Sequence, residues 1–461
     1  MRKVGRLVLH VVLAGLISGT LQMAWAEETA PRGQTIEERL EALEQKQKIL
    51  ERNRELEKEA EQEKAKSAVV AGAGKNGFTL SSADKSYQLK VSGYAQADGR
   101  FYFDDDAVPA TNTFLIRRAR LIFDGRLVRY VGFRVQPDFG QGRTTLFDAY
   151  LVLQFRPEAN LLVGKAKTPY GLERLQSALD RRFVELAFPD GLTPNRDVGV
   201  QFAGDALGGS LSYALAVLNG VVDGSSGDAD TDDDKDYAAR IFAHPFKHTG
   251  IGAIEGLGLG VATTYGDQQG TVSAPNLPSF KTQGQLAFFS YLAGGGTDNT
   301  VRAEGERFRF SPQGYYHWGP FGLLGEYART RQDVRMGAAI ARLTNTAWQL
   351  SAYYVLTGEK ASFKRVNPAK PFDPGKGHWG AFEVAARYSE LRVDDKTFPT
   401  FANIARSAKE ARAWAAGLNW YPNPNVRVLA DYGQTLFDGG APAGGDREKE
   451  KVLLTRFEVA Y

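Results

Sequence analysis

The stretch FLIRRARLIFDGRL, residues 114–127, places four arginines in a segment whose other positions alternate as in a β-strand. Arg118, Arg120 and Arg126 share one parity, whereas residues 119, 121, 123, 125 and 127 of the other parity are Ala, Leu, Phe, Gly and Leu. Successive side chains of a strand point to opposite faces, so one face is apolar and the other is charged. A guanidinium can bind two oxygens of an anion through its planar fork. The chemistry that this pattern predicts is therefore anion binding.

Further basic residues continue the pattern. Arg134 opposes the apolar face of 131–135, and Lys165 and Lys167 oppose Leu162 and Ala166. Residues 114–182 hold 13 Lys/Arg and 6 Asp/Glu, an excess of seven positive charges in a chain whose total charge is only +3. Cations that line a low-dielectric wall focus the field and select anions. We predict an anion path that is lined by six residues: Arg118, Arg120, Arg126, Arg134, Lys165 and Lys167.

An alternative for the same residues is internal charge pairing. Asp124, Asp138 and Asp148 lie on the charged face and could neutralise the arginines. The path would then have only a weak preference for anions, or would serve another solute.

Composition limits the classes of protein that could carry such strands. No run of 18 apolar residues occurs, so the sequence predicts no transmembrane helix, and mean hydropathy is −0.34. The chain has no cysteine, which excludes disulfides, thiolate catalysis and thiolate metal sites. Asp228, Asp230, Asp232 and Asp234 resemble a calcium loop, but Asp233 and Ala239 stand where an EF-hand needs Gly and Glu. We expect no metal and no other cofactor.

From residue 78 onward the chain consists of segments with period-2 alternation, separated by Gly, Pro, Asn and Asp clusters. The predicted class is all-β, an antiparallel transmembrane β-barrel of about 16 strands. The strands are near the length that crosses a bilayer, short turns alternate with long loops, and aromatic residues recur near segment ends. A soluble secreted β-sandwich is the alternative fold, because it also alternates. The predicted strands are 87–103, 113–127, 129–139, 145–156, 160–168, 197–205, 209–219, 236–244, 255–266, 305–316, 320–331, 344–356, 379–391, 411–421, 425–436 and 451–461.

The N-terminal region predicts export followed by a helix. Residues 1–26 have basic Arg2, Lys3 and Arg6, a short apolar core and an A-x-A site, as in a signal peptide. Residues 27–66 are predicted to be helical: Thr35 and Glu38 form a capping box, and apolar residues then recur at heptad spacing. The helix is either a single solvated helix or a short coiled coil that joins subunits or tethers the protein to a partner. Residues 67–84 are predicted to be a linker, and residues 85–461 are predicted to form the barrel domain.

Several blocks of the sequence resemble a known family. FLIRRARLIFDGRL, LFDAYLVLQFRPEANLLVGKAKTPYGLE, LTGEKASF, PFDPGKGHWGAFEVAARYSEL and GLNWYPNPNVRVLADYGQT resemble the phosphate- and polyphosphate-selective porins (the porin O/P family) of Gram-negative outer membranes, from about residue 85 to 461. The last residues, VLLTRFEVAY, resemble the C-terminal signal of outer-membrane barrels, with Tyr461 in place of the usual Phe. The resemblance implies a trimeric 16-stranded barrel with segments folded into the lumen and a path lined by basic residues.

Two long connections are candidates for such lumenal segments. Residues 169–197 follow the fifth predicted strand and carry Arg174, Arg181, Arg182 and Arg196. The resemblance implies a constriction loop here; the alternative is an ordinary outer loop or a subunit contact. Residues 357–378 are long and basic but fall on the short-turn side of the predicted barrel. Either they also enter the lumen or the strand count is wrong by one.

Together these observations predict a porin in the outer membrane of a Gram-negative bacterium, with its N-terminal helix in the periplasm. It would form a water-filled channel for small anions such as phosphate or polyphosphate; the alternatives are a general porin and a channel for another solute. The expected partners are outer-membrane lipid, the permeating anions and two further copies of the chain, and no nucleic acid. No nucleophile elbow or P-loop occurs in the sequence, so we expect no enzymatic activity.

Overall fold

The protein is described by a computed structural model over residues 35–74, 77–103, 110–228, 230 and 232–461. The chain divides into two compact units between Lys66 and Ser67. The predicted signal peptide, residues 1–26, lies outside the described residues.

The first unit contains the helix α1 (Ile36–Ser67). The predicted capping box is confirmed: the Thr35 N–H donates to the Glu38 carboxylate at 3.0 Å, and the Glu38 N–H donates to the Thr35 hydroxyl at 3.4 Å. Leu40, Leu43 and Leu50 of the heptad seam are 58%, 65% and 62% exposed. The described residues of the first unit do not cover these apolar side chains, so they are available to pack against another helix. The coiled coil itself stays a prediction.

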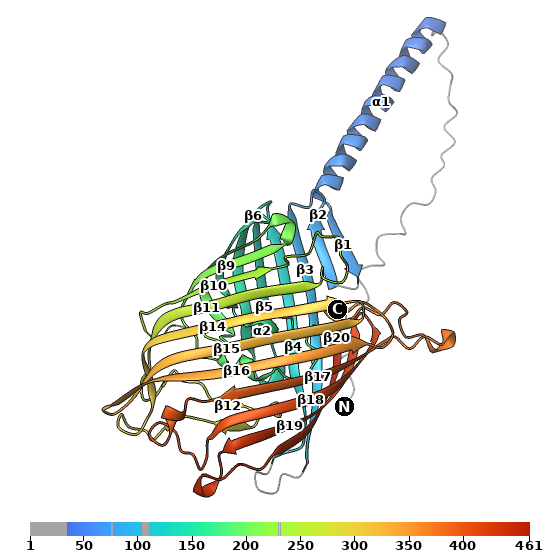
Figure 1. Cartoon of the computed structure of the whole chain (residues 1–461). Coiled ribbons are helices and arrows are strands. Elements are labelled where there is room, and N and C mark those ends of the chain that lie inside the picture. The colour runs from blue at the N-terminus through green and yellow to red at the C-terminus, as the bar shows by residue number, and fades with distance from the viewer. Residues whose placement is uncertain (1–34, 75–76, 104–109, 229, 231) are drawn as a thin grey trace, which may run out of the picture. The chain divides into compact units, whose positions relative to one another are not determined.

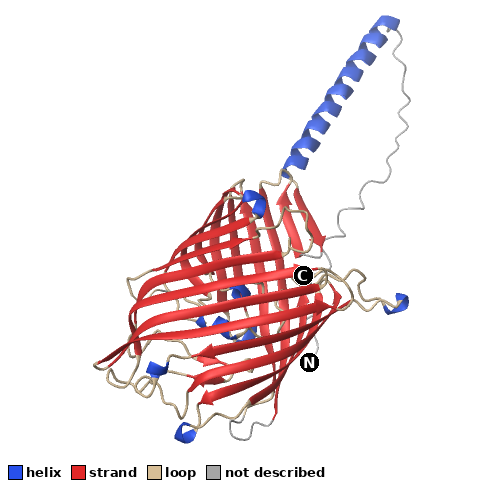
Figure 2. Cartoon of the chain, in the orientation of Figure 1, coloured by secondary structure: helices blue, strands red, loops and turns tan. Residues whose placement is uncertain are grey.

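The second unit is a closed antiparallel barrel of 16 strands, which confirms the predicted class and strand number (Figures 1 and 2). The ring closes where β20 pairs with β3, with Ala460 opposite Tyr94. The barrel strands are β3 (Tyr87–Phe103), β4 (Thr113–Leu127), β5 (Val131–Asp138), β6 (Thr145–Arg156), β7 (Ala159–Lys167), β8 (Arg196–Ala206), β9 (Leu211–Leu218), β10 (Asp236–Ala243), β11 (Leu257–Gln269), β14 (Arg302–Trp318), β15 (Phe321–Met336), β16 (Ala339–Val355), β17 (Ala381–Arg392), β18 (Ala408–Asn423), β19 (Val426–Gly439) and β20 (Glu450–Ala460).

The predicted linker over residues 67–84 is replaced by a hairpin. Strands β1 (Val69–Gly74) and β2 (Gly77–Ser82) pair with each other, and β2 also pairs with the start of β3. The run FTLSS in this stretch alternates with a period of two, as a strand does. It pairs with the first residues of β3, which extend past the last residue of β20 and therefore have a free edge. No helix among the described residues is long and apolar enough to cross a membrane.

The two ends of the barrel differ in their connections. Turns of two to four residues, such as 157–158, 319–320 and 424–425, lie at one end, which we call the short-turn end. The connections 168–195, 219–235 and 270–301 lie at the opposite, long-loop end. The segment 356–380 joins β16 to β17 at the short-turn end, and both strands pair with their neighbours in sequence order. The strand count was therefore right, and this segment is a long connection on the short-turn side.

Long connections fill part of the barrel interior. The segment 168–195 contains α2 (Leu172–Leu175) and the 3₁₀ turn η2 (Phe188–Leu192), and Figure 1 shows α2 within the ring of strands. Phe188 and Leu192 pack with Phe280 and Phe288 of the 270–301 connection against the wall formed by β15–β18. Shorter elements complete the structure: β12 (Phe280–Lys281), β13 (Ala287–Phe289), η1 (Gly140–Gly142), η3 (Leu207–Gly209), η4 (Pro374–Lys376), η5 (Asp395–Thr397) and η6 (Pro442–Gly444).

Candidate functional site

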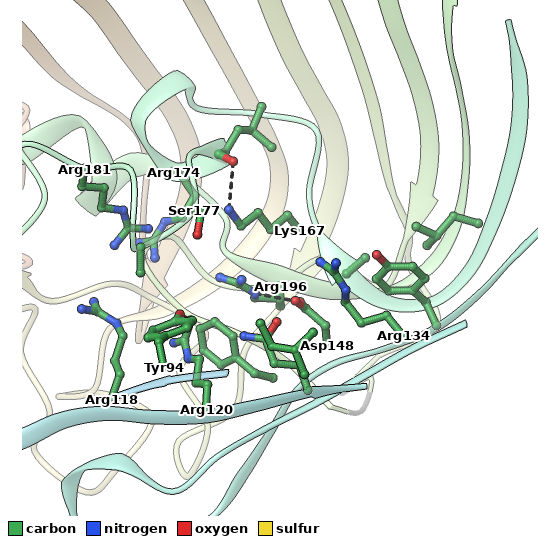
Figure 3. A pocket seen from close by; sticks show the side chains of 18 of the residues that line it. Tyr94, Arg118, Arg120, Arg134, Asp148, Lys167, Arg174, Ser177, Arg181 and Arg196 are labelled. Atoms are coloured by element: carbon green, nitrogen blue, oxygen red, sulfur yellow. Dashed lines mark hydrogen bonds and ion pairs between the residues drawn. The ribbon is translucent and has the colours of Figure 1, made fainter. Parts of the chain in front are cut away.

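A cavity of about 490 Å³ lies between the inner faces of β3–β8 and the segment 168–195 (Figure 3). Its lining includes seven basic side chains and one acidic side chain, Asp148. The basic residues are Arg118, Arg120, Arg134, Lys167, Arg174, Arg181 and Arg196. All seven are among the ten basic residues that the sequence predicts for the anion path and the constriction loop. Because Asp148 is already bonded to Arg196, the lining suits an anion better than a metal ion.

A β-bulge sets the positions of the first arginines. In the pairing of β3 with β4, Gln96 lies opposite Arg118 but the next residue, Ala97, lies opposite Ile116. The extra residue, Arg117, therefore does not follow the alternation. Its guanidinium bonds to Glu185 of the 168–195 segment at 2.7 Å, inside the barrel. Strict alternation would put Arg117 on the face opposite Arg118, and the bulge is the reason that its side chain nevertheless lies inside the barrel.

A second bulge brings an aromatic ring into the cavity. Where β5 pairs with β6, Gln136 opposes Asp148 and Pro137 opposes Leu146, so Phe147 is the extra residue. Strict alternation along 147–155 predicts that Phe147 shares the apolar face of Ala149, Leu151 and Leu153, but its ring lines the cavity. The guanidinium carbons of Arg120 and Arg196 lie 3.6 and 3.7 Å from the centroid of its ring. Cations over a buried ring are attracted by its quadrupole, so Phe147 helps to hold both arginines.

Four of the seven cations of the cavity have a carboxylate partner. Arg120 bonds to Asp138 at 2.7 Å and Arg196 bonds to Asp148 at 3.0 Å. Arg134 bonds to both oxygens of Asp124, and Arg174 pairs with Asp190. These pairs fix the side chains and cancel much of their charge.

The other three cations have no carboxylate partner among the described residues. Arg118 donates to the amide oxygen of Gln96 at 2.8 Å. Lys167 donates to the backbone carbonyls of Leu175 and Gln176 at 2.9 and 2.7 Å. The Arg181 guanidinium has no hydrogen bond within the described part of the chain, although it is 4% exposed. Burial and the nearby charge of Arg174 lower the pKa of Arg181 to about 10, which leaves it charged at neutral pH.

The segment 168–195 is fixed to the barrel wall by buried polar contacts. Glu185 accepts hydrogen bonds from Arg117 of β4 and Arg100 of β3. Burial disfavours the charged form of Glu185, but the charge and hydrogen bond of Arg117 outweigh burial and lower its pKa below the usual range. On other strands, Glu326 accepts from the N–H of Glu173 at 2.9 Å, and Asp431 accepts from the N–H of Val184 at 2.5 Å. These contacts hold Arg174 and Arg181 at the cavity.

Three of the selected residues lie outside the cavity. Arg126 is exposed near the short-turn end of β4. Lys165 is buried in an ion pair with Asp228. Arg182 points away from Arg181, pairs with Glu383 at 3.4 Å and donates to backbone carbonyls of the 356–380 segment, those of Ser362, Phe363 and Lys364.

These carbonyl contacts show that part of the 356–380 segment enters the barrel from the short-turn end. The N–H of Arg365 donates to Asp180 at 2.9 Å, and the ring of Phe363 stacks on Tyr315 of β14 at 4.9 Å. Of the two alternatives that the sequence left open for this region, entry into the lumen holds. Arg182 thus joins the two segments that narrow the interior.

Comparison with known proteins agrees with this geometry. Residues 89–461 match the family model described as "Phosphate-selective porin O and P". Porin O of Pseudomonas aeruginosa is 25% identical over 433 residues, which cover 84% of this chain and 91% of that protein.

Two solved structures share the fold at low sequence identity. The outer membrane channel DcaP of Acinetobacter baumannii has a TM-score of 0.53 and 12% identity, over 82% of this chain and 98% of that chain. An anion-selective porin from Comamonas acidovorans has a TM-score of 0.50 and 11% identity, over 81% and 100%. The family match covers nearly the whole barrel, and the chain belongs to the family of phosphate-selective porins O and P.

Proposed function

We propose that the barrel is an outer-membrane channel for small oxyanions of the phosphate class, and that the cavity between β3–β8 and segment 168–195 is its selective passage. The observation that carries the proposal is the set of three cations without carboxylate partners among the described residues, the buried Arg118 and Arg181 and the partly buried Lys167. A mobile anion that enters the cavity would balance this charge, and such balance is favourable because unpaired cations in a low-dielectric site are costly.

The arrangement also suits transit. Arg118 and Arg181 offer guanidinium forks, while Lys167 offers a point charge that already has two carbonyl partners. An ion that meets several moderate sites in series can enter and still leave, which conduction requires. The four ion-paired arginines supply a polar wall, so the passage presents donors without a single deep trap.

A general porin with a weak anion preference is the second candidate. It is favoured by the four ion pairs of the same cavity, which neutralise more than half of its cations. The two candidates differ in whether phosphate competes with chloride at low concentration.

The other parts of the chain complete the proposal. Residues 1–26 would be a signal peptide, residues 27–66 a periplasmic helix that assembles with two further copies, and residues 85–461 the membrane domain. The exposed heptad seam of α1 supports trimerisation. The short-turn end would face the periplasm, as in bacterial outer-membrane barrels. Transport, and no catalysis, is the role that we assign.

The test is single-channel recording of the purified full-length protein in a planar bilayer under a KCl gradient, followed by addition of phosphate. We expect a reversal potential that favours chloride and a chloride current that phosphate blocks. Arg118→Gln should weaken the block about tenfold, whereas Arg126→Gln, on the same strand but outside the cavity, should leave it unchanged. A reversal potential near zero without phosphate block would replace the proposal with the general porin.

A further inference from the structure

The outer surface of the barrel carries a group of arginines that the channel does not use. On β15, Ala328, Thr330, Gln332 and Val334 are buried against the interior, so the alternate residues face outward. Three of these are arginines, and β16 contributes a fourth from the neighbouring position. We call this group the arginine patch: Arg329, Arg331, Arg335 and Arg342.

The patch begins within an aromatic girdle and extends beyond it toward the long-loop end. Tyr327 of β15 lies opposite Trp348 of β16, and the ring of Trp348 lies 5.3 Å from that of Tyr388 on β17. Outward-facing aromatic side chains mark the boundary between the hydrocarbon and the headgroups. Arg329 and Arg331 lie opposite Phe310 and Phe308 of β14, level with aromatic residues, whereas Arg335 and Arg342 lie farther toward the two-residue turn at 337–338.

Carboxylates hold the arginines in place but do not cover them. Arg342 bonds to both oxygens of Asp333 at 2.6 and 2.8 Å, and its side chain is still 50% exposed. Arg335 pairs with Glu304 at 2.5 Å, and Arg331 pairs with Glu306 and lies over the ring of Phe308. Arg329 is exposed and has no ion pair or hydrogen bond among the described residues. The patch thus presents oriented guanidinium donors and one uncompensated charge.

The depth of the patch indicates what faces it. From Tyr327 to Arg335 the strand rises roughly 20 Å along the membrane normal, at about 3.3 Å per residue and a tilt of about 40°. The headgroup layer of an ordinary phospholipid leaflet is only about 5–7 Å thick. An ordinary phospholipid headgroup therefore reaches only part of the patch, whereas a larger headgroup with more than one anionic group can contact several of its arginines at once.

We propose that the arginine patch binds the phosphorylated saccharide headgroup of an outer-leaflet glycolipid. Guanidinium forks suit phosphate, and the carboxylates beside them keep the donors oriented. This proposal requires that the long-loop end faces the cell exterior, which is part of the proposed function. The patch lies on the outer surface of the barrel and the cavity on the inner surface. A negative result for lipid binding would therefore leave the proposed anion channel standing, and the reverse is also true.

The test is native mass spectrometry of the full-length protein in detergent, titrated with an acylated glucosamine disaccharide bisphosphate. The dephosphorylated glycolipid and phosphatidylglycerol serve as comparison ligands. We expect the bisphosphate to bind at least tenfold more tightly than either. A basic residue near an anionic lipid surface contributes about fivefold, so Arg329→Gln should weaken binding about fivefold and the triple variant R329Q/R331Q/R342Q about a hundredfold.

Arg129→Gln, which removes an exposed charge from the turn between β4 and β5 at the short-turn end, is the matched control and should bind normally. Should the triple variant fail to fold, Arg329→Gln decides the question alone, because Arg329 is exposed and its loss leaves no carboxylate unpaired. Equal binding by Arg329→Gln and the wild type would overturn the site. Equal binding of phosphatidylglycerol would overturn the assignment to a glycolipid, and equal binding of the dephosphorylated form would overturn recognition of phosphate.

Discussion

Arg120 and Arg196 come from strands that are not neighbours, yet both guanidinium groups lie over the same phenyl ring, that of Phe147, at 3.6 and 3.7 Å from its centroid. Each arginine also has its own carboxylate, Asp138 for Arg120 and Asp148 for Arg196. Two like charges are thus held close together by a ring that attracts both. The arrangement orders the basic wall of the channel without a negative charge between the two cations.

Replacing Phe147 with Leu should disturb this wall while keeping its volume and hydrophobicity nearly constant. The loss of two cation–π contacts, each worth about 0.5–2 kcal/mol, should let Arg120 and Arg196 rotate and should weaken phosphate block about tenfold. Single-channel recording with a phosphate titration measures the effect. Phe155→Leu is the control, since Phe155 lies on the same strand and is 56% exposed. An unchanged block in Phe147→Leu would show that the ring has only a packing role.

Glu185→Gln should release segment 168–195 from the wall. Glu185 is 3% exposed and bonds to Arg117 and Arg100, so its neutralisation leaves two arginines without their carboxylate. Removing one partner of a buried ion pair costs about 3 kcal/mol or more. We expect a lower free energy of unfolding in a urea titration in lipid vesicles, together with stronger chloride preference because a negative charge is lost from the lumen. Glu158→Gln, in the exposed turn between β6 and β7, should change neither quantity.

The same contact predicts how the channel responds to acid. The pKa of Glu185 lies below its ordinary value of 4.5, so the stability that its ionised form contributes is fully present above pH 4.5 and is lost as the pH falls through the lower, folded-state pKa. Conductance and resistance of segment 168–195 to proteolysis should therefore stay constant from pH 7 to pH 5. Release of the segment within that range would mean that the Arg117 contact does not form in the membrane.

The fold and much of the basic wall could be predicted from sequence because both depend on local alternation. Parity found Arg118, Arg120 and Arg134, whose side chains line the cavity. It fails at Phe147, where a bulge adds one residue and breaks the period of two, and a bulge likewise takes Arg117 out of the alternation. Two adjacent arginines in an otherwise alternating strand were the available signal of the first bulge.

The remaining differences between the predicted site and the structure come from contacts between segments that are distant in the sequence. The predicted parity of Lys165 is wrong, because Leu162 and Ala166, which were expected on the opposite face, line the cavity. Lys165 instead pairs with Asp228 of the 219–235 connection. Arg181 and Arg182 are adjacent in sequence, yet only Arg181 reaches the cavity, since the backbone of the loop turns between them. Arg126 shows that parity gives the face of a strand but not the depth along it. None of these features follows from a local pattern.

Arg182→Gln should detach the 356–380 segment from segment 168–195. The guanidinium donates to three backbone carbonyls of the 356–380 segment, at Ser362, Phe363 and Lys364, and glutamine has too few donors to replace it. We expect a larger single-channel conductance and new protease cleavage between residues 360 and 370. Lys360→Gln removes an exposed charge from the same segment and should leave both properties unchanged. Equal conductance of Arg182→Gln and the wild type would mean that the segment does not limit the flow of ions.

Polar substitution along the seam of α1 should separate assembly from conduction. Leu40, Leu43 and Leu50 are all more than half exposed within their own unit, so they contribute little to the stability of an isolated helix. If the helix joins three chains, the variant L40S/L43S/L50S should dissociate to monomers at a lower temperature in native gels, while the conductance per barrel is retained.

Glu41→Gln, at an exposed position away from the seam of the same helix, serves as the control. Because short seams are weak alone and gain from the high local concentration that linked barrels provide, the expected loss is partial. An unchanged dissociation temperature would leave trimer formation to the barrel alone. In that case α1 would be free to bind a different periplasmic partner, and its seam would be the surface to test for it.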